Sequence, residues 1–178
     1  MTLIGGLVGE IARVDIDDCY STGNITHIGQ NNNFYAGGLI GEAVSSNILQ
    51  AYSTGDISAS TESDSSFIGG LIAYFGVYVD DNKIYKFFNS FASGDIDVSS
   101  SKHVCIGDLY YGYKDNKVEF RDNYTFNGQE ITASTKSYNR NKEGATGAQM
   151  EEIWQFVYYN WNASIWEISL SENPTLKR

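Results

Sequence analysis

The chain has 178 residues, of which 42% are apolar and 14% aromatic, a composition that suits one folded domain and excludes an intrinsically disordered segment. The 22 acidic and 12 basic residues give a net charge of -10, which disfavours nucleic acid and anionic membrane surfaces as partners. No apolar run approaches the ~20 residues of a membrane helix, so we expect no membrane insertion in this segment.

A repeat of 32 residues opens the chain. The stretch IGGLVGEIARVDIDDCYSTGN at 4–24 returns as AGGLIGEAVSSNILQAYSTGD at 36–56. Each copy holds a Gly-Gly-Leu element and, farther along, an aromatic-x-x-Gly element. Because short apolar, β-branched segments alternate with Gly or polar turns and helical periodicity is absent, we expect three short strands per copy.

The third and fourth copies depart from this spacing. The third Gly-Gly-Leu element, at 69–71, follows after 32 residues, but its aromatic-x-x-Gly element, at 91–94, follows after 39. The extra residues fall in GVYVDDNKIY at 76–85, which predicts a polar loop inserted at a surface corner. The fourth copy is degenerate, with Asp108 for the second Gly and one extra residue between Tyr124 and Gly128.

Equivalent positions of the copies form columns of like residues. The structural repeat residues are Gly5, Gly6, Leu7, Gly37, Gly38, Leu39, Gly69, Gly70, Leu71, Tyr20, Tyr52, Phe91 and Tyr124. Further columns are Ile4, Ala36, Ile68 and Ile106; Ile16, Ile48, Phe87 and Phe120; and Ile25, Ile57, Ile96 and Ile131. Stacked units bury such columns at ~4.8 Å spacing, whereas one unit alone cannot. We therefore predict an all-β fold, a right-handed parallel β-helix of about four rungs with three short strands per rung, over a β-propeller or a leucine-rich repeat.

One column is polar where strict alternation would bury it. Ile16 and Tyr20 have the same parity, so Asp18 between them would also point inward. Its equivalents are Gln50, Asn89 and Asp122. Because unpaired buried carboxylates are costly, we expect a bend between positions 17 and 19 that turns this column to solvent.

These residues resemble the GLUG motif repeat, named for its GGLVG-type core. The matching stretches are GGLVG at 5–9, GGLIG at 37–41, CYSTGNI at 19–25, AYSTGDI at 51–57 and FASGDI at 91–96. The resemblance covers residues 3–131 and extends to TGAQM and SIWEIS in the tail. It implies a large bacterial surface or secreted protein, adhesin-like or immunoglobulin A1 protease-like, in which the repeats act as a stalk or presentation scaffold.

The tail differs from the repeat in pattern. We expect residues 1–143 to form the repeats and 144–178 to form a C-terminal capping helix and strand within the same structural domain. TGAQMEEIWQFVYYNW has helical apolar spacing, and SIWEISL alternates like a strand. The cap residues Trp154, Trp161 and Trp166 all lie here, and we predict a hydrophobic plug over the open end of the coil. A sugar-binding platform is the alternative.

The polar residues after the repeat glycines are candidates for chemistry. Asn24, Asp56 and Asp95 follow Gly in successive copies and would stack at one turn. Asp56 and Asp95 are weak candidates for a Ca²⁺ site or an acid-base pair. We expect instead that Asn and Asp occur here because they favour this turn after a glycine with left-handed backbone, and we expect no cofactor. Cys19 and Cys105 are expected to be small buried residues without a disulfide.

No catalytic motif is present: the sequence lacks HExxH and the G-x-S-x-G elbow, so no catalytic residue is assigned. We expect a non-enzymatic extracellular scaffold or adhesin-type module of a larger bacterial surface or secreted protein, whose partner would be a host glycan or protein. The alternatives are a carbohydrate-active β-helix enzyme, either a polysaccharide lyase or a glycosidase, and an accessory domain of a secreted protease. The chain begins inside a repeat unit without a signal pattern, so we expect a longer chain that carries the signal and anchor.

Overall fold

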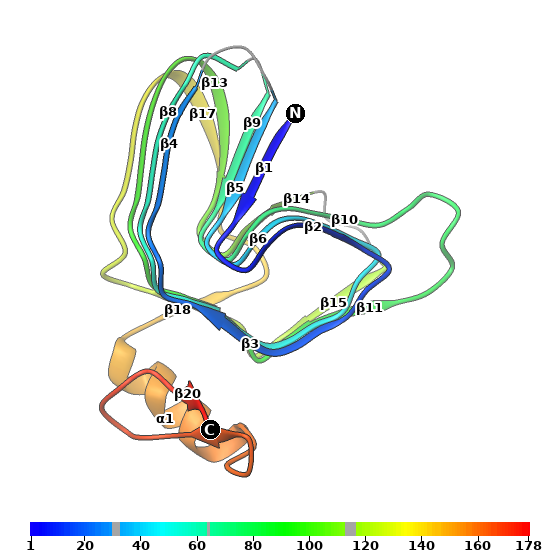
Figure 1. Ribbon diagram of the computed structural model, residues 1–178, viewed down its shortest axis with the longest axis vertical. Coiled ribbons are helices and arrows are strands. Elements are labelled where there is room, and N and C mark those ends of the chain that lie inside the picture. Colours follow the sequence, from blue (N-terminus) through cyan, green and yellow to red (C-terminus); the bar gives the residue numbers. More distant parts are fainter. Residues whose placement is uncertain (30–32, 64, 113–116) are drawn as a thin grey trace.

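Three walls of parallel strands wind into a coil, with the tail outside it (Figure 1). The computed structural model describes residues 1–29, 33–63, 65–112 and 117–178, apart from the side chains of 136–139. The first wall contains β1 (Thr2–Gly5), β4 (Ile25–Gly29), β5 (Phe34–Gly37), β8 (Ile57–Thr61), β9 (Ser66–Gly69), β13 (Ile96–Gly107) and β17 (Ile131–Asn141). The second contains β2 (Val8–Ala12), β6 (Ile40–Val44), β10 (Ile72–Gly76) and β14 (Tyr110–Gly112). The third contains β3 (Ile16–Ser21), β7 (Ile48–Ser53), β11 (Tyr85–Phe88), β12 (Phe91–Ala92), β15 (Val118–Arg121), β16 (Tyr124–Phe126) and β18 (Thr146–Ala148).

The predicted parallel β-helix is confirmed, and so is the alignment of its rungs. Each copy begins with a strand in the first wall, passes through the second and third walls, and ends with another strand in the first wall. Where the third copy meets the fourth, the ending strand and the beginning strand are continuous and form β13. The predicted columns pair residue by residue: Ile4, Ala36, Ile68 and Ile106; Ile16, Ile48, Phe87 and Phe120; Tyr20, Tyr52, Phe91 and Tyr124; and Ile25, Ile57, Ile96 and Ile131. Side chains of one type therefore stack along the axis of the coil.

The Gly-Gly-Leu element makes the sharp bend between the first and second walls. A Cβ on Gly37 would overlap the carbonyl oxygen of Ile40 on the next strand. A Cβ on Gly38 would overlap the carbonyl oxygen of Gly70 in the next rung and would lie 2.6 Å from Ser53 Oγ on the third wall. Both glycines are needed because the backbones approach too closely for any side chain. The bend pinches the coil against the third wall, and two separate apolar cores lie on either side of it.

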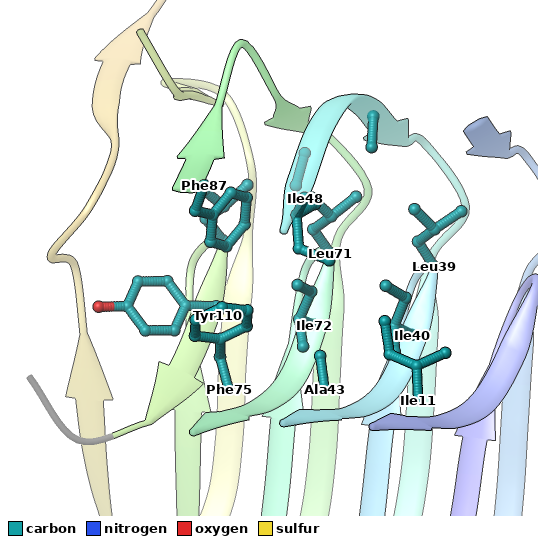
Figure 2. Close-up of a cluster of buried hydrophobic side chains, with 13 residues drawn as sticks. Ile11, Leu39, Ile40, Ala43, Ile48, Leu71, Ile72, Phe75, Phe87 and Tyr110 are labelled. Atoms are coloured by element: carbon teal, nitrogen blue, oxygen red, sulfur yellow. The ribbon is translucent and has the colours of Figure 1, made fainter. Parts of the chain in front are cut away.

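The leucine column lies in one of these cores (Figure 2). Leu39, Leu71 and Leu109 are at most 1% exposed, beside residues such as Ile72 and Phe87. Leu7, the first member of the column, is 49% exposed. Leu7 still stacks in register with this column, since its N–H donates to the carbonyl oxygen of Leu39 at 3.0 Å, and its side chain is exposed because it lies in the first rung.

The predicted bend in the polar column is present. Asp18, Gln50, Asn89 and Asp122 all have left-handed backbone, with φ between 48° and 56°. This conformation is tolerated best by short polar residues such as Asn and Asp. The bend shifts the alternation by one residue, so Ala51 points into the core while its neighbour Tyr52 packs on the tail outside the coil.

Placing the Tyr20 column on the inner face of the coil was therefore wrong, because the bend reverses the parity. The apolar outer column that results runs along the third wall, from Tyr20 in the first rung to Tyr124 in the fourth. The rings of Tyr20, Tyr52 and Phe91 stack with centroids 5.0 and 4.7 Å apart. A stripe of aromatic surface of this size needs a cover.

The tail supplies that cover. It consists of β18, the helix α1 (Met150–Asn160) and a small hairpin of β19 (Trp166–Glu167) and β20 (Thr175–Leu176). Trp161 and Trp166 are 5% and 0% exposed and pack against Tyr52. Figure 1 shows α1 outside the contour of the coil, beside the third wall. The prediction of a plug over the open end is wrong. The tail packs against the side of the coil, on the outward-facing aromatic column of the third wall.

Candidate functional site

The polar residues that follow the repeat glycines form a backbone ladder. Oδ1 of Asn24 accepts a hydrogen bond from the N–H of Asp56 at 2.9 Å. Oδ1 of Asp56 accepts one from the N–H of Asp95 at 2.9 Å, and Oδ1 of Asp95 one from Glu130 at 2.8 Å. Each side chain thus satisfies a donor of the next rung, which is the turn chemistry of Asx residues.

The glycines before this ladder were expected to be left-handed, and this is wrong. Gly144 is the one glycine with positive φ in the described ranges. Gly55 is required for a different reason: a Cβ there would overlap the carbonyl oxygen of Gly23 in the rung below. Close stacking of the rungs, rather than unusual backbone dihedrals, selects Gly at this column.

The surroundings of Asp56 and Asp95 do not suit a metal ion. Asp56 and Asp95 are exposed, each with one oxygen engaged in the ladder. Among the residues that the structure describes, no three His, Cys, Asp or Glu side chains converge as a metal site would require. Both are therefore best explained by their role in the turn.

The two thiols are separate and half-buried, rather than buried as expected. Cys19 shares a column with Ala51, and Cys105 shares one with Phe67. Cys19 is less covered than Ala51 because it lies in the first rung. Burial, followed by the charge of Asp18, raises the pKa of the Cys19 thiol, and burial raises that of Cys105. Both thiols are therefore poor nucleophiles.

The tail tryptophans do not form a sugar-binding platform. Trp161 and Trp166 are buried, and the indole N–H of Trp166 donates to Asp18 Oδ1 at 2.5 Å. Trp154 is half-buried, with its N–H donating to Asn173 Oδ1 at 2.9 Å. The hydrogen bond from Trp166 fixes the tail to the coil, and the one from Trp154 joins two parts of the tail. In the described part of the chain, no helix, α1 included, is long and apolar enough to cross a membrane.

The inserted loop of the third copy is the main departure from the regular coil. Residues 77–84 leave between β10 and β11 and project away from the body (Figure 1). Tyr78, Val79 and Ile84 are 42%, 91% and 58% exposed, so the projection presents apolar side chains to solvent. Exposed apolar residues gathered on a loop mark an interaction site more often than isolated ones do.

Contacts at its base hold the loop in place. The N–H of Tyr78 donates to Ser45 Oγ at 3.0 Å, and the guanidinium of Arg13 lies 4.8 Å from the centre of the Tyr78 ring. The hydroxyl of Tyr85 donates to Asp81 Oδ2 at 2.5 Å. Residues from all three of the first rungs thus support the loop.

A cavity of about 280 Å³ lies under this loop, and its lining is polar. The residues around it are Arg13, Asp15, Ser45, Asn47, Asp81, Lys83, Ile84 and Tyr85. The hydrogen bond from Tyr85, followed by the N–H of Lys83, lowers the pKa of Asp81 and keeps it ionised. The lining has two acidic side chains, Asp15 and Asp81, and two basic ones, Arg13 and Lys83, which suit a polar ligand with both hydrogen-bond donors and acceptors. The sequence located the loop through the 39-residue spacing, but it gave no sign of the cavity, whose lining comes from three rungs.

The fold and the repeat define a β-helical repeat protein. The model of the GLUG motif matches residues 2–26, so the first rung of the chain carries this motif. No curated protein matches the chain. A solved structure described as "a putative immunoglobulin A1 protease from Bacteroides ovatus" is similar, with a TM-score of 0.66 and 16% identity over 97% of this chain and 52% of that one. The chain spans about half the length of that protein, and at this identity the likeness shows a shared fold.

Proposed function

We propose that the chain is a non-enzymatic extracellular scaffold or adhesin-type module of a larger bacterial surface or secreted protein, and that it presents the loop at 77–84 to a host glycan or protein. The observation that carries the proposal is the exposed apolar loop on a rigid coil. The GLUG motif at residues 2–26 supports the extracellular setting. The ladder at Asp56 and Asp95 supports a structural rather than a catalytic use of those carboxylates.

A loop replacement tests the proposal. In the second rung, Ser45-Ser46-Asn47 connects Val44 to Ile48, and these two residues pair with Gly76 and Phe87 in the third. Replacing residues 77–86 by Ser-Ser-Asn therefore shortens the corner to that of a regular rung. The parent and this variant would be compared on arrays of glycans and host proteins, with a Tyr78→Ser/Val79→Ser variant that keeps the loop length.

The expected result is that the parent binds a ligand and both variants lose it, while thermal unfolding is little changed. Equal binding by the parent and the shortened variant would show that the loop is not the binding element. Release of oligosaccharides from an arrayed polysaccharide would instead favour the carbohydrate-active enzyme. Binding by none of the three proteins would count against an adhesin role.

A second candidate is an accessory domain of a secreted protease. It is favoured by the description of the structurally similar protein, of which this fold covers 52%. In this case the partner of the loop would be the protease domain of the same polypeptide. Crosslinking of the loop to a catalytic domain expressed from the full gene would support it.

A further inference from the structure

A second surface, away from the inserted loop, also has the chemistry of a binding site. The first and second walls meet at the Gly-Gly bend and form a re-entrant corner on the outside of the coil (Figure 1). Four aromatic rings gather there: Tyr35 from β5, Phe67 from β9, Tyr74 from β10 and Tyr111 from β14. The ring of Phe67 lies 4.8 Å from Tyr35, 5.5 Å from Tyr74 and 5.4 Å from Tyr111, centre to centre. All four are half-buried, so part of each remains accessible.

Two carboxylates continue the row of Tyr74 towards the first rung. Glu10 and Glu42 pair in register, and Glu42 pairs with Tyr74 on the next strand. Together with the four rings they make up what we call the aromatic–acidic face. Among the residues that the structure describes, neither carboxylate forms an ion pair; the ion pairs there join Arg121 to Asp122 and Arg140 to Asp108.

The electrostatics of this face favour a cation. Glu10 and Glu42 are neighbours on adjacent strands, and like charges placed so are destabilising. Burial, followed by the charge of Glu10, raises the pKa of Glu42. Glu42 pairs in register with Tyr74, whose ring centre lies 5.9 Å from that of Tyr35, so this carboxylate lies beside the aromatic rings. Burial, followed by the charge of Glu42, raises the pKa of Tyr35. A positive charge bound here would relieve the repulsion between the acids.

We propose that the aromatic–acidic face binds an arginine side chain of a partner protein. A guanidinium group can stack on the face of Tyr35 while it donates hydrogen bonds to Glu42. The net charge of -10 attracts a basic segment to the surface before contact. This surface is independent of the loop at 77–84, so the two proposals fail separately.

The test uses an acetylated, amidated hexa-arginine peptide with a fluorescent label, titrated with the full chain at low ionic strength. The variant Glu10→Gln/Glu42→Gln is compared with Glu119→Gln/Glu172→Gln, which removes the same charge from exposed positions elsewhere. We expect the first variant to bind about tenfold more weakly than the parent and the second variant less than about twofold more weakly. A carboxylate in contact with the bound guanidinium contributes more to binding than a distant carboxylate, whose attraction is screened. Equal weakening in the two variants would overturn the proposal.

The aromatic part of the face is tested by Tyr35→Leu and Tyr35→Phe. The leucine variant keeps an apolar side chain without a ring, whereas the phenylalanine variant keeps the ring without the hydroxyl. We expect Tyr35→Leu to weaken hexa-arginine binding by about fivefold and Tyr35→Phe to bind like the parent. Unchanged binding by Tyr35→Leu would contradict the proposal. So would binding of a neutral hexasaccharide that depends on Glu10 and Glu42, since the face would then be a glycan site.

Discussion

Replacing Leu39 by alanine tests whether the stacked columns stabilise the coil. The side chain of Leu39 is fully buried in the core between the second and third walls, and Leu71 follows it in the next rung (Figure 2). Removing it loses the transfer free energy of a buried leucine and leaves a cavity that stacked backbones cannot close. The expected loss in the free energy of unfolding is ~2–5 kcal/mol.

Leu7 provides the matched control, since it occupies the same column but is 49% exposed. Leu7→Ala opens no closed cavity and exposes little new apolar surface, so its cost should stay below about 1 kcal/mol. For a chain of this length, each kcal/mol corresponds to ~2–4 °C in Tm. Leu39→Ala should therefore unfold at clearly lower temperature than Leu7→Ala.

The measurement is equilibrium unfolding in urea, followed by far-UV circular dichroism for the coil and by tryptophan fluorescence for the tail. Coincident transitions from the two probes would justify a two-state free energy. If Leu39→Ala and Leu7→Ala cost the same, the column would not be the source of stability and the reasoning from rung stacking would be refuted.

Three further predictions address the ladder, the tail and the outer face. Asp56→Asn should leave stability within about 0.5 kcal/mol because Oδ1 can still accept from Asp95, whereas Asp56→Ala should cost about 1 kcal/mol; a Tm that shifts with added Ca²⁺ or with EDTA would point to a metal instead. Trp166→Ala should cost ~3–5 kcal/mol and increase binding of a hydrophobic dye, since it uncovers the aromatic column; unchanged dye binding would show that the tail does not depend on this ring. The raised pKa of Glu42 means that its favourable contribution is complete below its ordinary value of 4.5 and is lost as pH rises through the folded-state pKa. Glu42→Gln should therefore raise Tm at neutral pH and change it little near pH 3, and a thermal-shift series across pH would disprove this if the gain were the same at both ends.

The coil was predictable from the sequence because a constant repeat length places equivalent residues in register in neighbouring rungs. In-register columns such as Ile25 with Ile57 follow from a 32-residue spacing without knowledge of any contact. The bend at Asp18 was also predictable, since a polar residue between two apolar ones of equal parity has to be accommodated.

The orientation of Tyr20 could not be derived in the same way, because a single left-handed residue changes the parity of everything after it. The tail was misplaced as a direct consequence: an inward aromatic column would have left the open end as the main surface to cover. The aromatic–acidic face was missed because Tyr35 and Tyr74 lie on two walls, and nothing in their spacing shows that the Gly-Gly bend brings the walls together.

The lateral tail has a consequence for the order in which the chain can fold. The hydrogen bond from Trp166 to Asp18 joins residues 148 positions apart, and Trp166 also contacts the rings of Tyr20 and Tyr52. A chain that emerges from the ribosome with its N-terminus first can assemble its rungs in turn, but their aromatic column stays uncovered until the tail has been made. The tail therefore joins rungs that each depend on their neighbours into one cooperative body when it docks on the third wall.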